Sequence, residues 1–188
     1  MYKRQDLYKQ ATSYASITDN VEAHHETAMR VAMLAVAKKA VQYGFKIKPL
    51  FAFNGSFMFK LYIHVQKISP KGSCPFHKES FYMFCPECMF VETQESFKSQ
   101  SNCIVCDTPL IRQGPIWGKP LFSLSFVQEV KKVFEQNENK YIAKKKIEEI
   151  LHTIKGEASL GNDLLTPYSI YFLSKFLKCN PPSLLWIK

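Results

Sequence analysis

The chain has 188 residues and a mass of 21.7 kDa, a length that fits one or two domains. Its 46% hydrophobic and 14% aromatic residues indicate a folded protein and exclude a disordered chain. Arg30, Lys38, Lys48 and Lys60 interrupt the most apolar stretches, and no apolar segment follows Met1. We therefore expect neither a membrane span nor a signal peptide.

The charge is positive and unevenly distributed. The formal net charge is +9, and residues 1–70 contribute most of it, with 10 basic against 4 acidic residues. Basic segments around a neutral middle favour a polyanionic partner, RNA or DNA, because bound phosphates release counterions; the alternative is ordinary solubility charge. The seven glycines form neither a G-x-G pair nor a P-loop, which excludes the two common nucleotide-binding loops.

The first elements in chain order are a helix and a hairpin. Asp19 or Asn20 is a suitable cap for a helix that ends at Gly44. Residues 47–53 and the alternating stretch 57–66 predict two strands, joined by a two-residue turn at Asn54-Gly55. Apolar odd-numbered residues predict one buried face for the second strand.

After a linker at 69–73, residues 74–120 are rich in Cys, Pro and Phe and lack a helical period. A helical pattern then covers about 125–155 and stops at Gly156, with one charged face towards solvent. Thr166-Pro167 begins a short helix over 168–177, and Asn180-Pro181-Pro182-Ser183 begins another. Two short helices at a tight turn suggest part of a helix-turn-helix or winged helix.

Two cysteine pairs carry the clearest chemistry. Cys85 and Cys88 form one C-x2-C knuckle, and Cys103 and Cys106 form a second. In a chain without a secretion signal this spacing favours a metal over disulfides. Four thiolates around Zn²⁺ leave no open coordination position, so we predict a structural zinc site. The alternative is a set of reduced, buried cysteines without metal.

Other possible ligands are less well placed. Cys74 and His77 have C-x2-H spacing and could bind a second metal or substitute in the first site, but a solvent-facing loop explains them better. Adjacent histidines at 24 and 25 point in different directions on a helix, so we expect no metal there. We expect Cys179 to be a small core residue. No nucleophile–His–carboxylate arrangement is evident.

Several motifs, taken in order, resemble the tRNA (guanine-26-N2)-dimethyltransferase family. Gly114-Pro115-Ile116-Trp117 followed by Pro120-Leu121 is similar to a family signature just after its cysteine knuckles. His25-Glu26 with Arg30 resembles a His-Glu-x-x-x-Arg helix start. The resemblance covers roughly residues 14–188 and extends through the strand 59–65, Phe126-Val127 and the segment 165–184.

The resemblance implies transfer of one or two methyl groups from S-adenosylmethionine to the exocyclic nitrogen of guanosine 26 in tRNA. It also implies an α+β fold. Residues 1–68 would supply the closing helix and hairpin of a class I methyltransferase domain, and residues 69–188 a family-specific C-terminal domain. That domain would contain a zinc ribbon at about 81–110 and a truncated, winged-helix-like tRNA-binding segment at about 125–188.

On this mapping the donor loop and catalytic motif belong to a missing N-terminal half. We therefore expect a fragment, located in the cytoplasm, with no catalytic or donor-binding residue of its own and no activity alone. Candidate phosphate contacts, each of which could instead be ordinary solvated surface, are Lys60, Arg112, Lys119, Lys144, Lys145 and Lys146. The alternative function is a stand-alone zinc-ribbon module that binds nucleic acid without catalysis.

Overall fold

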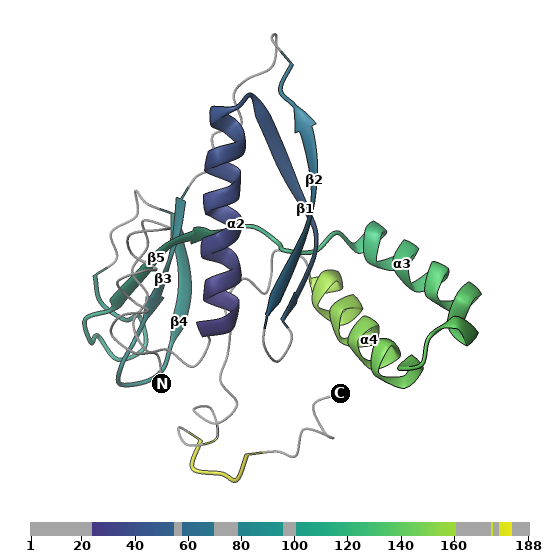
Figure 1. The fold of residues 1–188 in the computed structure, drawn as a ribbon. Helices are drawn as coiled ribbons and strands as arrows, with labels where there is room; N and C mark the ends of the chain where they lie inside the picture. The colour runs from purple at the N-terminus through teal and green to yellow at the C-terminus, as the bar shows by residue number, and fades with distance from the viewer. Residues whose placement is uncertain are drawn as a thin grey trace.

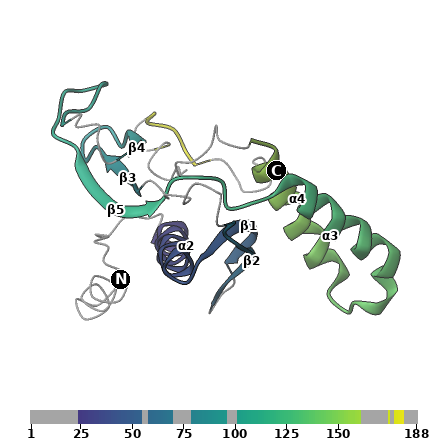
Figure 2. The same ribbon diagram turned by 90° about the horizontal axis from the view of Figure 1, so that it is seen from above.

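A central helix lies between two small antiparallel sheets (Figures 1 and 2). The computed structural model describes residues 24–54, 58–69, 79–95, 101–160, 174 and 177–181. In chain order its elements are α2 (His24–Gln42), β1 (Phe45–Asn54), β2 (Phe59–Lys67), β3 (Glu79–Phe84), β4 (Val91–Glu95), β5 (Ile111–Trp117), α3 (Leu124–Asn137), η1 (Glu138–Lys140) and α4 (Lys144–Leu160).

Helix α2 ends where the sequence predicts. The amide of Gly44 donates to the carbonyl of Val41 at 3.0 Å, and Gly44 has a φ of +77°, a left-handed conformation that glycine adopts at little cost. The predicted cap at Asp19 or Asn20 lies outside the described residues, and the described helix begins at His24. The helix reverses into β1 directly after Gly44.

The hairpin confirms the predicted buried face only at Leu61 and Ile63, because Phe59 and Val65 are 41% and 52% exposed. It also corrects the predicted turn. Leu61 and Ile63 of β2 pack towards α2, while Lys60 and Tyr62 are exposed. Asn54 pairs with Phe59, so residues 55–58 connect the strands and the expected two-residue turn is wrong. The observed register places Ala52 opposite Leu61 beneath α2, and burial of that pair outweighs the local turn preference of Asn-Gly.

The second sheet has the strand order β4-β3-β5, with all pairs antiparallel. Strand β5 packs on α2 at a different side of the helix from the hairpin (Figure 2). One buried core therefore joins both sheets through the helix, and residues on both sides of position 68 share it. Its members are Met29, Met33, Leu34, Ala37, Ile47, Ala52, Trp117 and Leu121.

The helical pattern after residue 124 is interrupted, contrary to the prediction of one helix over about 125–155. Asn137 leaves the helical conformation with φ −127°, and its side-chain amide donates to the carbonyl of Val133 at 2.9 Å. Such side-chain bonds compete with helix continuation. The chain then reverses, so that α4 packs on α3 and continues past Gly156 to Leu160.

The C-terminal predictions are tested only in part. The two short helices expected after Thr166 lie almost entirely outside the described residues. Cys179 is exposed, so its prediction as a core residue is wrong. Lys178 has φ +52°, and the Cys179 amide donates to the Ser174 carbonyl at 2.9 Å; this turn directs Cys179 to the surface. Among the described helices, none has the length and apolarity that a membrane span requires.

Candidate functional site

The two cysteine knuckles share one backbone geometry. In the first, the Cys85 amide donates to the Phe90 carbonyl at 2.8 Å, and the Met89 amide donates to the Cys85 carbonyl at 3.1 Å. Met89 has φ 62°, a left-handed conformation that is uncommon outside glycine and asparagine. These bonds turn the chain tightly at the end of β3 and direct both thiols to one side.

The second knuckle repeats this pattern at the same offsets. The Cys103 amide donates to the Thr108 carbonyl at 2.8 Å, the Asp107 amide donates to the Cys103 carbonyl at 2.9 Å, and Asp107 has φ 57°. The Val105 amide also lies 3.4 Å from Cys103 Sγ. Amide donors that point at a sulfur stabilise its thiolate form. In the second knuckle, this bond therefore favours the thiolate form of Cys103.

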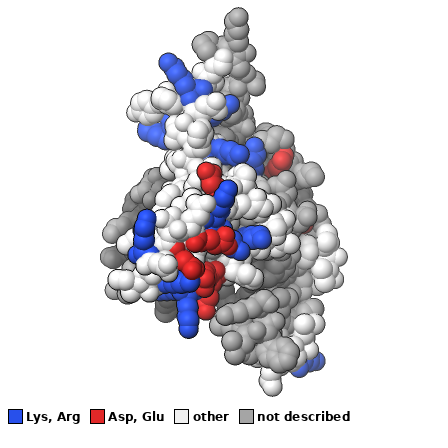
Figure 3. Space-filling view, turned by 90° about the vertical axis from the view of Figure 1, so that its right-hand side faces the viewer, with Lys and Arg blue, Asp and Glu red and all other residues white. Residues whose placement is uncertain are grey.

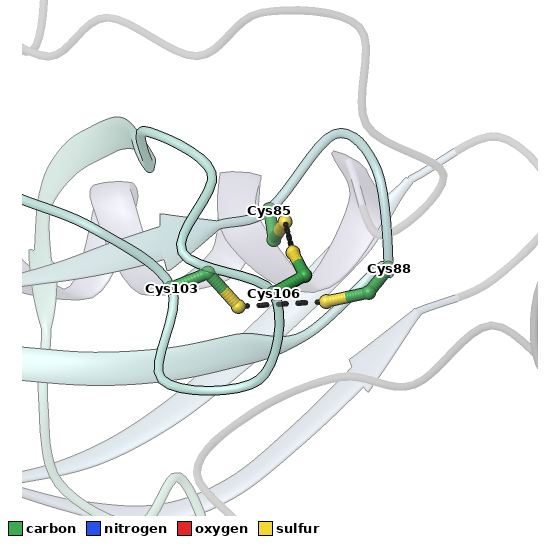
Figure 4. Close-up of side chains that lie close together, drawn as sticks. All are labelled: Cys85, Cys88, Cys103 and Cys106. Atoms are coloured by element: carbon green, nitrogen blue, oxygen red, sulfur yellow. Dashed lines mark hydrogen bonds between the residues drawn. The ribbon is translucent and has the colours of Figure 1, made fainter.

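The four sulfur atoms converge (Figure 4). They lie within 4.8 Å of one another, with 3.4 Å between Cys85 and Cys106 and 3.4 Å between Cys88 and Cys103. These distances are too long for disulfides. A zinc ion with Zn–S bonds of ~2.3 Å needs sulfur atoms about 3.8 Å apart. The donor set and its size thus fit a tetrahedral zinc site.

The environments of the four sulfurs differ. Cys85 and Cys103 are buried, whereas Cys106 is exposed. Burial raises the pKa of Cys88 to about 12, and hydrogen bonds with Thr108 lower the pKa of Cys106 to about 6. The cluster joins the β3–β4 turn to the segment that precedes β5.

A buried arginine joins that sheet to α2. Arg30 is 4% exposed; its Nε donates to Glu26 Oε1 at 2.9 Å, and its Nη1 donates to the carbonyls of Trp117 at 3.0 Å and Lys119 at 2.9 Å. We call Arg30, Glu26 and the two carbonyls the seam. It brings together motif residues that lie far apart in sequence. His25 lies in the first turn of α2, and its side chain is outside the description.

Beside the seam lies a residue that the sequence did not single out. Tyr82 of β3 is 3% exposed. Its burial raises its pKa, and the nearby positive charge of Arg30 opposes part of that rise. No short motif marks Tyr82, because its role depends on the pairing of β3 with β5. Gly114 and Pro115 lie next to it in β5, where Gly114 has φ +131° and passes close to Phe81 and Ser80.

The six candidate phosphate contacts lie on three parts of the fold. Lys60 is exposed on β2, and Arg112 of β5 lies over the Phe81 ring at 3.5 Å. Lys119 is exposed beside the seam. At the start of α4, Lys145 and Lys146 are exposed, whereas Lys144 pairs with Glu138 at 2.6 Å.

The face formed by α3 and α4 is mixed in charge. Figure 3 shows Asp and Glu side chains near its middle, with Lys and Arg around them and above. The charge and hydrogen bond of Glu138 raise the pKa of Lys144. The cations of this face are therefore separated by acidic groups and do not form one continuous basic patch on it.

Comparison with known proteins gives a consistent result. The sequence model of the family described as "N2,N2-dimethylguanosine tRNA methyltransferase" matches residues 8–188. The tRNA (guanine(26)-N(2))-dimethyltransferase of Methanocorpusculum labreanum is 24% identical over 173 residues, which cover 91% of this chain and 44% of that protein. The Homo sapiens protein of the same name is 22% identical over 195 residues, covering 94% of this chain and 29% of that protein.

A solved structure shares the fold. The complex of Trm1 from Pyrococcus horikoshii with S-adenosyl-L-methionine superimposes with a TM-score of 0.71 at 20% sequence identity, covering 93% of this chain and 43% of that one. The chain thus spans less than half the length of the relatives described here.

Proposed function

The chain belongs to the N2,N2-dimethylguanosine tRNA methyltransferase family, and we propose that it is the C-terminal portion of a tRNA guanine-26 dimethyltransferase. In this portion, the described residues contain only antiparallel strand pairs, and the sequence has no glycine-rich loop. Doubly wound domains bind nucleotide-like ligands at the carboxyl ends of parallel strands. We therefore assign donor binding to the remainder of the relatives' length, where S-adenosylmethionine would supply the methyl group.

Within this chain we propose two units. Residues 1–68 would form the edge of the catalytic domain. Residues 69–188 would form a family-specific domain with a zinc ribbon at about 81–110 and a helical tRNA-binding segment from about 125. The sulfur atoms of Cys85, Cys88, Cys103 and Cys106 would hold one structural zinc ion, because four thiolate ligands leave no position for substrate.

The role we propose for this portion is to hold tRNA in a fixed position relative to the catalytic domain. The observation that carries it is the seam. Arg30 lies in the first unit and binds the carbonyls of Trp117 and Lys119 in the second at 3.0 and 2.9 Å. A buried, multiply bonded guanidinium restrains the two units against each other. RNA bound by the second unit would then reach the catalytic domain in a single orientation.

Lys60, Arg112, Lys119 and the lysines at 144–146 are the proposed phosphate contacts. Lys145 and Lys146 are the clearest pair to test, because both are exposed and neither has an ion-pair partner within the described part of the chain. We expect the chain to bind a tRNA transcript with an affinity that falls as salt rises. With S-adenosylmethionine added, the chain alone should transfer no methyl group.

The test compares two double variants that remove the same charge. Lys145→Ala with Lys146→Ala should make the negative slope of log affinity against log salt less steep, by roughly 0.7–0.9 per lost contact. The control is Lys131→Ala with Lys132→Ala on α3, where Lys131 pairs with Glu135 at 3.6 Å; its slope should stay that of the unmodified chain. Equal slopes in both double variants would contradict a specific role for α4, and methyl transfer by the chain alone would contradict the proposed division.

A further inference from the structure

A cavity of about 510 Å³ opens between the β1–β2 hairpin and the α3–α4 hairpin. We propose that it binds a single unstacked nucleobase of the bound RNA. This inference rests on the proposed tRNA-binding function and adds a site to it. The volume lies within the ~300–1,000 Å³ typical of pockets for small ligands, so a nucleoside unit can enter it.

Aromatic and aliphatic side chains make up most of the cavity lining. Six of its thirteen lining residues are Phe or Tyr, five are aliphatic, and two are charged. Two of the lining tyrosines remain accessible: Tyr62 on β2 is 48% exposed, and Tyr141 before α4 is 43% exposed. Single-stranded nucleic acid is commonly held by stacking of its bases on such rings, since every base offers a π face.

Neighbouring rings hold both tyrosines in place. Phe51 meets Tyr62 edge to face, with ring centroids 5.7 Å apart, and Phe134 lies 5.5 Å from Tyr141. Phe134 is itself only 6% exposed, so it anchors Tyr141 to the packed side of α3. Rings fixed in this way lose little conformational freedom when a flat ligand binds.

The two charged lining residues select the kind of ligand. Lys60 of β2 and Glu129 of α3 both line the cavity and are exposed. Among the described residues, no ion pair involves either of them. An ammonium group binds phosphate, whereas a carboxylate repels phosphate and accepts hydrogen bonds from N–H groups. A nucleotide satisfies both, with its phosphate near Lys60 and a base amino or imino group near Glu129.

The test removes one ring at a time from the cavity. Tyr62→Ala and Tyr141→Ala should each weaken binding of a tRNA transcript by about fivefold or more, because a base–aromatic stack contributes ~1–3 kcal/mol, equivalent to about 5- to 150-fold. Binding of a fully paired RNA duplex of similar length should change by less than twofold, because a duplex offers no unstacked base. Tyr43→Ala is the matched control, since Tyr43 is 70% exposed and lies outside the cavity.

Two further variants distinguish loss of a binding contact from loss of folding. Tyr62→Phe keeps the ring and should retain the tRNA affinity of the unmodified chain. Val133→Trp fills the cavity from an exposed position, since Val133 is 49% exposed and lines it, and should weaken tRNA binding without deleting any contact.

The outcomes separate the inference from the function on which it rests. If the unmodified chain binds neither tRNA nor duplex, the proposed function fails and the inference fails with it. If the unmodified chain binds tRNA and the cavity variants bind it equally well, only the inference is overturned. In that case, the occupant of the cavity would be a protein segment instead of a nucleobase. Equal weakening of tRNA and duplex binding would also overturn it.

Discussion

The guanidinium of Arg30 donates a 3.0 Å hydrogen bond to the carbonyl oxygen of Trp117, 87 residues further along the chain. Trp117 is the last residue of β5 and is 4% exposed. The same guanidinium group binds Glu26 one helical turn earlier. A charge buried this deeply is stable only because several acceptors surround it. The contact therefore fixes the position of α2 against β5.

Replacement of Arg30 should destabilise the chain strongly. Arg30→Met keeps much of the side-chain volume but leaves the carbonyls of Trp117 and Lys119 without their donor. We expect the free energy of unfolding in urea to fall by about 2–4 kcal/mol. Lys38→Met is the control, because Lys38 pairs with Glu79 where both side chains are accessible, 42% and 37% exposed, and should cost at most about 1 kcal/mol. Equal losses of unfolding free energy in the two variants would contradict the stabilising role of the seam.

Gly118 and Gly156 should respond to alanine with opposite signs. A Cβ at Gly118 would lie 1.8 Å from Ser80 Oγ and 2.4 Å from Ser80 Cβ, and Ser80 is 5% exposed. Gly118→Ala should therefore cost about 2–3 kcal/mol. A Cβ at Gly156, within α4, meets nothing within 4 Å, so Gly156→Ala should stabilise the chain by about 0.5–1 kcal/mol.

Ser80→Gly provides the check on Gly118. It removes both atoms that clash and leaves only Ser80 Cα at 3.8 Å, an ordinary contact. Combined with Gly118→Ala, it should recover most of the lost unfolding free energy. If the double variant is no more stable than Gly118→Ala alone, the clash is not the cause.

Local signals in the sequence predicted the parts of the fold that depend on local spacing. The cysteine knuckles, the stop at Gly44 and the alternation in β2 each follow from residues within one turn or one strand. The interruption at Asn137 could not be predicted in this way, because the apolar period continues across it. Folding back is favoured by burial of Leu151 and Ile154 on α4 together with Phe134 on α3, which is a tertiary effect.

The seam and the cavity are long-range features. Resemblance marked Glu26 with Arg30 in one motif and Trp117 in another, but the spacing of 87 residues between Arg30 and Trp117 does not indicate that they are in contact. The cavity needs strands β1 and β2 to face α3 and α4, and the sequence predicted neither that packing nor the helical hairpin. Tyr62 and Tyr141 were therefore not recognised as a pair.

The four-cysteine cluster should bind about one equivalent of zinc. Cys85→Ser and Cys103→Ser each replace a buried ligand and should abolish most of that binding, which elemental analysis of the purified chain measures. Since metal binding and folding of such sites are coupled, amide hydrogen exchange over residues 79–95 and 101–117 should also accelerate. Chelation of the metal should reproduce this effect in the unmodified chain.

Cys179→Ser is the matched control for the zinc experiment. Cys179 is exposed and is not a member of the cluster, so its replacement should leave both metal content and exchange unchanged. A chain that keeps slow exchange over these residues while containing no metal would contradict the zinc site.

Alkaline pH should weaken the seam through Tyr82. Burial raises the pKa of Tyr82 above its usual value, so the folded chain keeps a phenol proton that the unfolded chain releases near pH 10. The stability due to this difference is fully present below about pH 10 and is lost as the pH rises further, with a slope of up to about 1.4 kcal/mol per pH unit.

Tyr82→Phe removes the titrating group, so the unfolding free energy of this variant should fall less steeply between pH 10 and 11. Tyr43→Phe, at a position that is 70% exposed, should keep the steep dependence, and a Tyr82→Phe slope as steep as that of the unmodified chain would assign the alkaline loss to other groups.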